Sequence, residues 1–278
     1  MTAAPPLTDR TALALHRRRA FRKRNTPLFL HQAALQDIRL RLADVQREFG
    51  RVAIVTGCPD FWKSAFPQAE ICCDEEPIRF RQQEYDLVLH AMALHWSDDP
   101  VGQLIQCRRV LRPDGLLLCV FFGEDTLIEL RTSLLQAEVE IVGGASPRVA
   151  PMTSLSDCGA LLQRARFALP VADRVALSVS YPTIWTLMHD LRHMGESNAL
   201  HSRRRVPSHR NLFAVAEENY RKQFTDNKGK LRATFDLMFL TGWAPAESQP
   251  QPLHPGSATR RLSDALNTVE QMFESDDR

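Results

Sequence analysis

The chain has 278 residues, 44% of them hydrophobic and 24% charged, which is the composition of a globular protein with one large domain and appendages. Its formal net charge at pH 7 is only +2, so the overall charge gives no indication of nucleic-acid binding. No apolar run approaches the roughly 20 residues that a membrane-spanning helix needs, and no long apolar core follows the basic start as it would in a secretory signal.

Positive charge is concentrated in two blocks, one near the start (Arg17, Arg18, Arg19, Arg22, Lys23 and Arg24) and one at Arg203, Arg204 and Arg205. Residues 1–27 are rich in proline and arginine and are expected to form a basic N-terminal arm. A mitochondrial transit peptide is the alternative, because Asp9 is the only acidic residue of this arginine-rich start. The second block is expected to be a solvated loop, with binding of an acidic peptide or a phosphate-bearing surface as the alternative.

Apolar periodicity predicts alternating strands and helices over residues 28–245. Helices are expected over 28–49, 100–111, 124–141, 156–166, 182–194 and 209–224, and strands over 52–56, 69–73, 85–91, 116–122, 171–181 and 233–241. Glu124 and Asp125 favour the start of the third helix. This alternation predicts a doubly wound α/β sheet.

Residues 246–278 are expected to form a proline-rich loop and a C-terminal amphipathic helix. The apolar stripe of that helix is expected to dock on the body of the protein rather than on a partner; it comprises Leu262, Ala265, Leu266, Val269, Met272 and Phe273. The six cysteines (Cys58, Cys72, Cys73, Cys107, Cys119 and Cys158) show no CxxC spacing and are expected to be reduced thiols.

The stretch from Val52 to Asp60 is an apolar strand that ends at a glycine and leads into a turn. In nucleotide-type folds this turn carries several glycines, so that the backbone can approach the cofactor closely. Here only Gly57 is present, Pro59 has no N–H to offer a ligand, and Asp60 adds a negative charge. The loop therefore predicts a damaged cofactor site.

Two strings are recognisable: D-L-V-L-H-A-M-A-L-H-W (Asp86–Trp96) and R-R-V-L-R-P-D-G (Arg108–Gly115). They resemble the fourth strand, following loop, helix and turn of class I S-adenosylmethionine (SAM) methyltransferases. Four more strings narrow the resemblance: Gly123–Arg131, Ser146–Thr153, Met188–Asn198 and Pro255–Thr259. Together they are similar to the methyltransferase-like complex I assembly factor family, whose mitochondrial member is an arginine hydroxylase acting on a core subunit of NADH dehydrogenase. Malonyl-carrier-protein methyl ester synthases are a more distant resemblance.

The resemblance implies a Rossmann-like, seven-stranded, mostly parallel sheet, reduced near its second strand, with a helical insertion at about 182–230. It implies SAM as the cofactor and a complex I (NADH dehydrogenase) subunit as the protein substrate, with no nucleic acid and no transmembrane segment. It further implies a bacterial cytoplasmic protein, with peripheral association with the inner membrane left open, or a mitochondrial matrix protein if the source is eukaryotic.

The chain departs from the family at the cofactor loop. Val55 stands at the family's acidic position, Pro59 and Phe61 stand at its later glycines, and only Gly57 and Cys58 match. The stretch that follows is too short for a normal helix and a second strand ending in a ribose-binding carboxylate. Losing two charged hydrogen bonds to the ribose costs on the order of 3–6 kcal/mol, or roughly a hundred- to ten-thousand-fold in Kd. We therefore expect weak SAM binding or none.

Candidate site residues follow from the strand ends and from the resemblance. The resemblance assigns cofactor contacts to Gly57, Asp74, Glu75, His90 and Trp96, with Asp74 accepting from the adenine amino group. Catalytic roles are expected for His95, Arg131 and Glu196, and substrate contacts for Gly123, Thr126, Glu129, Ser197 and Asn198. His95 follows a strand at the edge where open α/β sheets place ligands, and an imidazole can act as a base near neutral pH. The alternative is that these side chains only pack loops or cap helices.

His189 and His193 are spaced like the histidine pair of zinc-binding helices, but no third ligand is evident, and no metal is expected. Three functions stay open. The first is modification of a protein substrate, by arginine hydroxylation or methyl transfer. The second is a non-catalytic assembly or chaperone role with a lapsed SAM site. The third is SAM-dependent methyl transfer to a small carboxylate or a carrier-bound substrate.

Overall fold

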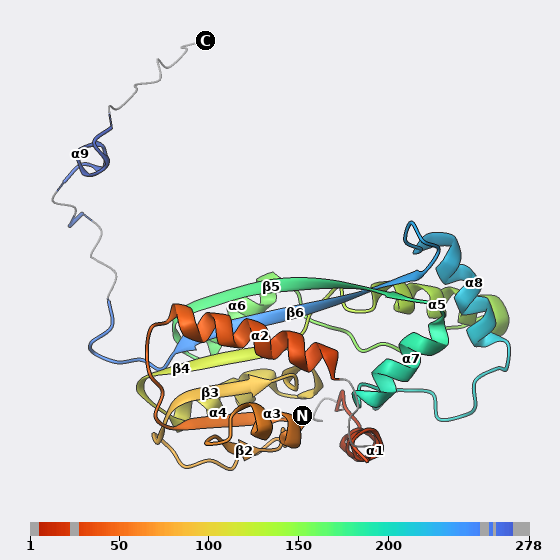
Figure 1. Cartoon of the computed structure of the whole chain (residues 1–278), viewed down its shortest axis with the longest axis horizontal. Coiled ribbons are helices and arrows are strands. Elements are labelled where there is room, and N and C mark those ends of the chain that lie inside the picture. The colour runs from red at the N-terminus through yellow and green to blue at the C-terminus, as the bar shows by residue number, and fades with distance from the viewer. Residues whose placement is uncertain (1–5, 23–27, 251–255, 258–259, 269–278) are drawn as a thin grey trace, which may run out of the picture. The chain divides into compact units, whose positions relative to one another are not determined.

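The computed structural model describes residues 6–22, 28–250, 256–257 and 260–268 (Figure 1). The chain divides into a main unit, residues 1–246, and a second unit, residues 247–278. Within the described part of the second unit there is a short helix, α9 (Leu262–Leu266). Val269, Met272 and Phe273 of the predicted apolar stripe lie outside the described residues.

The main unit is built on a sheet of β1 (Val52–Thr56), β2 (Glu70–Cys72), β3 (Tyr85–Ala91), β4 (Leu111–Phe122), β5 (Ala168–Tyr181) and β6 (Leu231–Trp243), in the order β2-β1-β3-β4-β6-β5. The first four strands in this order run parallel. Strand β6 runs antiparallel to both β4 and β5. The structure confirms the predicted α/β, Rossmann-like fold.

The sheet has six strands, so the expectation of seven is wrong in its count. Between β1 and β3 the chain holds only α3 (Pro59–Ala65) and the three-residue β2. This segment is too short for two strands and their connecting helix, and the missing strand lies in the region that the sequence marked as reduced.

Helices cover both faces of the sheet. Helices α2 (Phe29–Asp44) and α3 pack on one face, and α4 (Pro100–Val110) and α6 (Leu155–Arg164) pack on the other. Figure 1 shows α2 lying across the sheet. Successive side chains of a strand alternate between the faces: Leu87 and Leu89 belong to the core on the α2 side, while Val88 belongs to the core on the α4 side.

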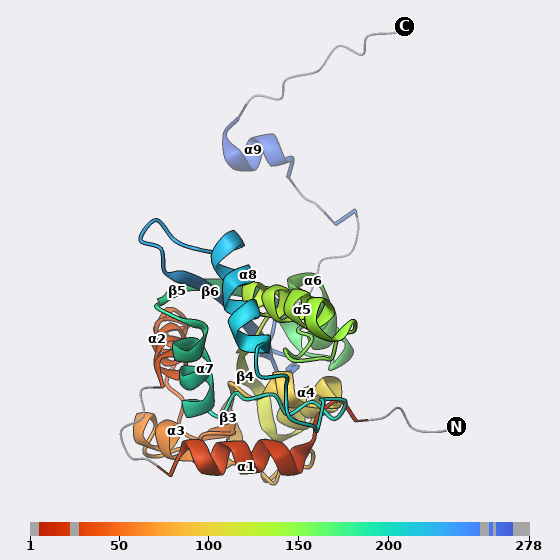
Figure 2. The same ribbon diagram turned by 90° about the vertical axis from the view of Figure 1, so that its right-hand side faces the viewer.

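The remaining helices gather at the carboxyl ends of the parallel strands (Figure 2): α1 (Arg10–Ala20), the 3-10 turn η1 (Leu94–Trp96), α5 (Ile128–Val142), α7 (Ile184–His193) and α8 (Leu212–Gln223). The segment predicted to be an arm therefore contains a helix. Helix α5 begins at Ile128 rather than at Glu124, because the chain first makes a turn that ends at Leu127 with a left-handed φ of 56°. No helix in the described part of the chain is long and apolar enough to cross a membrane.

Asp236 of β6 carries a buried carboxyl group with poor compensation. The side chain is inaccessible to solvent, and the nearest cation, Nη1 of Arg174, is 3.7 Å away. Burial raises the pKa of Asp236 above its ordinary value of 3.8. Because the folded state then binds the proton more tightly than the unfolded state, this group lowers stability as the pH rises through the folded pKa.

We therefore expect Asp236→Asn to raise the free energy of unfolding by about 1 kcal/mol near pH 8, and to have little effect near about pH 3, below the ordinary pKa of 3.8, where the carboxyl group is largely protonated in both states. Urea denaturation at the two pH values measures this difference. Asp44→Asn is the control, because Asp44 is exposed. A destabilised Asp236→Asn variant at the higher pH contradicts the prediction.

Candidate functional site

Two neighbouring hollows lie at the carboxyl edge of the sheet. One, here called the cofactor half, lies at the ends of β1 and β2 and is lined by Arg10, Leu13, Ala14, Arg17, Gly57, Cys73, Asp74, Glu75 and Glu76. The other, here called the Glu196 cavity, lies beyond β4 among α5, α7 and η1. In Rossmann-type folds this edge is where ligands bind.

The cofactor half is occupied by an arginine from α1. A Cβ added to Gly57 would overlap the Arg17 guanidinium, so the side chain lies directly against the one glycine of the loop. Nη1 of Arg17 donates to Oδ1 of Asp74 at 2.6 Å, and Nη1 of Arg10 donates to Oδ2 of the same carboxylate at 3.3 Å. Arg17 therefore packs against two of the residues to which the resemblance assigns cofactor contacts, Gly57 and Asp74.

The Arg17–Asp74 pair is largely shielded from water, with side chains 12% and 7% exposed. Burial alone raises the pKa of Asp74, but the Arg17 charge, aided by Arg10, outweighs it and holds that pKa below its ordinary value. The carboxylate is thus ionised at neutral pH, and its charge is paired with Arg17 and Arg10 of the same chain. An adenine amino group would have to compete with two guanidinium groups for it.

The other predicted cofactor residues have internal or surface partners. Glu75 is exposed and lies 3.7 Å from Arg79. His90 is buried, with Nε2 3.2 Å from Oε1 of Gln103, and burial lowers the pKa of His90 to about 4. Trp96 lines the Glu196 cavity instead of the cofactor half, and its ring packs against α1 near Leu13.

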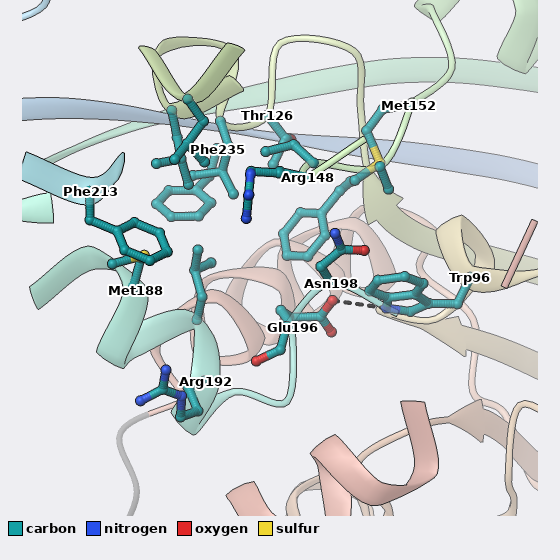
Figure 3. Close-up of a pocket in the computed structure, with 18 residues that line it drawn as sticks. Trp96, Thr126, Arg148, Met152, Met188, Arg192, Glu196, Asn198, Phe213 and Phe235 are labelled. Atoms are coloured by element: carbon teal, nitrogen blue, oxygen red, sulfur yellow. Dashed lines mark hydrogen bonds between the residues drawn. The ribbon is translucent and has the colours of Figure 1, made fainter. Parts of the chain in front are cut away.

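The Glu196 cavity has a volume of about 220 Å³ and a predominantly apolar wall (Figure 3). Its lining comprises Trp96, Phe122, Thr126, Leu127, Leu130, Leu134, Arg148, Val149, Ala150, Met152, Met188, Leu191, Arg192, Glu196, Ser197, Asn198, Phe213 and Phe235. Glu196 is the one acidic side chain among these described residues. Arg148 also lines it, but its charge is balanced by Glu138 at 2.6 Å.

Glu196 follows α7 and is anchored through one oxygen. Trp96 Nε1 donates to Oε2 at 2.9 Å, and Nε2 of His95 lies 3.2 Å from the same atom. Within the described residues, Oε1 has no hydrogen-bond partner in the structure. Burial raises the pKa of Glu196, but His95, Arg17 and the Trp96 N–H favour the ionised form, and the pKa lies below its ordinary value of 4.5. An ionised carboxylate with one spare oxygen faces an aromatic cavity.

His95 supports Glu196 rather than lining its cavity. Its ring is buried, with a centroid 4.7 Å from that of Phe122, and it lines a separate hollow on the other side of Phe122. Nδ1 has no hydrogen-bond partner among the described residues. The structure thus brings the predicted pair, His95 and Glu196, into direct contact across 101 residues of sequence.

The predicted substrate residues divide into two groups. Thr126, Ser197 and Asn198 line the cavity. Glu129 of α5 instead accepts hydrogen bonds from the backbone N–H and the hydroxyl of Thr234 in β6. Gly123, at the end of β4, packs closely against β6, because a Cβ there would overlap Met238 and Asp236. Glu129 and Gly123 therefore hold α5 and β4 against β6.

Arg131, a predicted catalytic residue, does not line the Glu196 cavity. Its Nη2 donates to the carbonyl of Ala150 at 3.2 Å. Since Ala150 is a wall residue, Arg131 supports the cavity from outside. The rings of His189 and His193 are 6.2 Å apart, and the described residues contain no cluster of three metal-ligating side chains.

The sequence assigned no role to four arginines of the site: Arg10, Arg17, Arg148 and Arg192. Arg17 was visible as part of the basic block, but nothing in that block indicates which arginine meets Asp74. Arg148 lies in the string Ser146–Thr153 that carried the family resemblance, and that string was the available signal for it.

Comparisons with known proteins show which families this chain is similar to. Residues 19–119 match the family described as "Methyltransferase domain". The Homo sapiens protein named "Arginine-hydroxylase NDUFAF5, mitochondrial" is 39% identical over 197 residues, which cover 71% of this chain and 57% of that protein. A protein of the same name from Dictyostelium discoideum is 40% identical over 187 residues, covering 67% and 43%. A malonyl-acyl-carrier-protein O-methyltransferase from Xylella fastidiosa is 34% identical over 184 residues, covering 66% and 60%.

Among solved structures, the YcgJ protein from Bacillus subtilis aligns with a TM-score of 0.44 at 12% identity, covering 85% of this chain and 99% of that one. The resemblance read from the motifs is confirmed: the chain carries a methyltransferase domain with a Rossmann-like fold. It is a homologue of the arginine-hydroxylase NDUFAF5 proteins. The chain spans 43% to 60% of the length of these curated relatives.

The methyltransferase domain implies SAM as cofactor, yet the residues of the cofactor half do not fit it. Arg17 covers Gly57, and Asp74 is held by two arginines. The loop also offers Pro59, which lacks an N–H, at the start of α3.

We expect calorimetric titration with SAM to give a Kd weaker than about 100 µM, against the micromolar range of an intact site. A methyltransferase with a complete glycine loop, titrated in the same buffer, is the positive control. Low-micromolar binding by this chain overturns the prediction.

Proposed function

We propose that this methyltransferase-like protein acts on a protein substrate and receives an arginine side chain of that substrate in the Glu196 cavity. The proposed substrate is a subunit of NADH dehydrogenase, as the family resemblance implies. The relatives are named arginine hydroxylases, and we favour hydroxylation of the arginine, in which dioxygen and a two-electron reductant from outside this chain convert a C–H bond into C–OH and release water. The proposed location is the bacterial cytoplasm, or the mitochondrial matrix for a eukaryotic source.

The observation that carries the proposal is the ionised carboxylate of Glu196 in an aromatic cavity. Guanidinium groups pair with carboxylates and stack on aromatic faces, and Trp96, Phe122 and Phe235 supply such faces here. The opposing charge of Arg148 is neutralised by Glu138. Arg192 also lines the cavity, so an entering cationic side chain meets the charge of Glu196 and apolar walls together with the charge of Arg192, which has no ion pair among the described residues.

In this arrangement Glu196 binds the guanidinium, and His95 with Trp96 holds the carboxylate in place. Positioning of this kind is what an enzyme requires to direct a reagent to one atom of a flexible side chain. Methyl transfer is the less favoured modification, because it needs SAM in the half that Arg17 occupies. The same objection applies to a carrier-bound substrate, despite the similarity to malonyl-acyl-carrier-protein O-methyltransferases.

A second candidate is a non-catalytic assembly role, in which the chain holds its partner without modifying it. The Arg17–Asp74 pair favours this candidate, since it engages two of the predicted cofactor-binding residues, Gly57 and Asp74, in contacts within the protein.

Mass spectrometry of NADH dehydrogenase subunits from cells lacking this chain separates the candidates. Loss of a one-oxygen increment on an arginine, restored by the wild-type gene and not by Glu196→Gln, supports the enzyme. Loss of the assembled complex with no missing mark supports the assembly role. Unchanged marks together with unchanged complex contradict both.

A further inference from the structure

A further hollow, distinct from the cofactor half, adjoins the Glu196 cavity and is lined by basic side chains. It has a volume of about 370 Å³ and is here called the basic pocket. Its lining comprises His16, Arg19, Ser146, Pro147, Arg148, Arg192, Ser197, Asn198, Arg203 and Arg204. None of these described residues is acidic. Its arginines come from three regions that are distant in sequence: α1, the stretch after α5, and α7 with the loop that follows it.

Two of the five arginines are neutralised within the protein. Arg148 pairs with Glu138 at 2.6 Å, and Arg203 pairs with Asp9 at 2.9 Å. For Arg19, Arg192 and Arg204 the structure gives no ion pair with any described residue. Three uncompensated positive charges around one concave surface repel one another, and an anionic ligand relieves that repulsion.

The two hollows share a wall. Arg148, Arg192, Ser197 and Asn198 line both of them, and Figure 3 shows Arg148, Arg192 and Asn198 around the Glu196 cavity. Asn198 is fixed in this wall by its own contacts: Nδ2 donates to the Pro147 carbonyl at 2.9 Å, and Oδ1 accepts from the Leu200 N–H at 3.0 Å. A ligand that fills one hollow therefore lies next to the other.

We propose that the basic pocket binds an acidic side chain of the same protein segment whose arginine enters the Glu196 cavity, an inference that rests on the proposed function for its second half. An extended peptide advances roughly 3.3 Å per residue, and the two hollows share a wall, so the acidic residue lies close to the arginine in the sequence of the bound segment. The site then recognises a charge pattern, with a cation at Glu196 and an anion at Arg19, Arg192 and Arg204.

Fluorescence anisotropy with three labelled peptides tests this proposal. The parent peptide has one arginine with aspartates on both sides; the second has asparagines in place of the aspartates; the third has glutamine in place of the arginine. For the wild-type chain we expect the parent to bind about tenfold more tightly than the asparagine peptide, the product of a few partly exposed ion pairs. The preference should shrink as salt is raised.

The variant that removes the pocket's charge is Arg19→Gln with Arg204→Gln, and its matched control is Arg18→Gln with Arg210→Gln. Arg18 and Arg210 are exposed and lie outside the pocket lining, so both variants lose the same net charge. We expect the pocket variant to lose the aspartate preference and the control to keep it. Equal loss in both variants, or no aspartate preference in the wild type, overturns the proposal.

The glutamine peptide separates this proposal from the proposed function. If wild type binds the glutamine and parent peptides equally well, arginine recognition by the Glu196 cavity fails, while an aspartate preference that depends on Arg19 and Arg204 still supports the basic pocket. If the arginine matters and the aspartates do not, the basic pocket is rejected and the proposed function stands.

Discussion

Replacing Arg17 by alanine is expected to lower the free energy of unfolding by about 2–4 kcal/mol near pH 7, because breaking a buried ion pair leaves its partner uncompensated. The partner is Asp74, which is 7% exposed and keeps only the longer contact of 3.3 Å with Arg10. Urea denaturation of the two proteins measures the loss. The neighbouring Arg18→Ala is the control, since Arg18 is exposed, and it should be close to neutral.

The loss should depend on pH in a defined direction. In the wild type the pKa of Asp74 lies below its ordinary value of 3.8, so the stabilisation is present above that value and disappears as the pH falls through the lowered folded pKa. Without Arg17, burial dominates and the pKa of Asp74 rises. The difference in the free energy of unfolding between wild type and Arg17→Ala should therefore be largest near neutral pH, and it should close only as the pH falls through the lowered pKa of Asp74 in the wild type.

Gly57→Ala offers an independent check on the position of Arg17. A methyl group at Gly57 would overlap the guanidinium, so alanine must displace Arg17 from Asp74 and destabilise the wild type. In the Arg17→Ala background the same substitution should be nearly neutral, which gives a coupling energy on the order of 1–3 kcal/mol in a double-mutant cycle. Additive effects of the two substitutions contradict the placement of Arg17.

The strands were predictable because each buried parallel strand is a continuous apolar run. Strands β1 and β3 begin and end where the sequence placed them, at Val52–Thr56 and Tyr85–Ala91. The start of α5 was not predictable: Glu124 and Asp125 have the charge that favours a helix start, but tertiary contacts hold Gly123 and Leu127 to the backbone of β6 instead. Local propensity was overridden by packing against a strand about 110 residues away.

Some residues of the candidate site were predictable from the sequence, and others were not. His95, Trp96 and Glu196 were found because they lie in strings that resemble the family, and the structure brings them together. The Arg17–Asp74 contact joins residues that are 57 positions apart, and no periodicity or spacing rule specifies which of several arginines makes it. The basic pocket combines side chains from three regions that are distant in sequence, so only the folded chain reveals that its charges share one surface.

Replacing Glu196 by glutamine is expected to weaken binding of the arginine-containing peptide about 100-fold, because a hydrogen bond to a charged group contributes about 1.5–3 kcal/mol. Glutamine has nearly the same size, and its amide oxygen can still accept from Trp96 Nε1, so the cavity should keep its shape. Binding of the peptide with glutamine in place of arginine should not change. Anisotropy titrations of both peptides measure the two effects together.

The pH dependence identifies the group responsible. Because the pKa of Glu196 lies below 4.5, the wild type should hold the arginine peptide with constant affinity from about pH 8 to about pH 5 and lose it only below that range. Glu218→Gln is the matched control, since its carboxylate is exposed and pairs with Lys222 on the surface. If Glu196→Gln binds the arginine peptide as tightly as Glu218→Gln does, the carboxylate of the cavity is not the arginine receptor, and the proposed function must be abandoned.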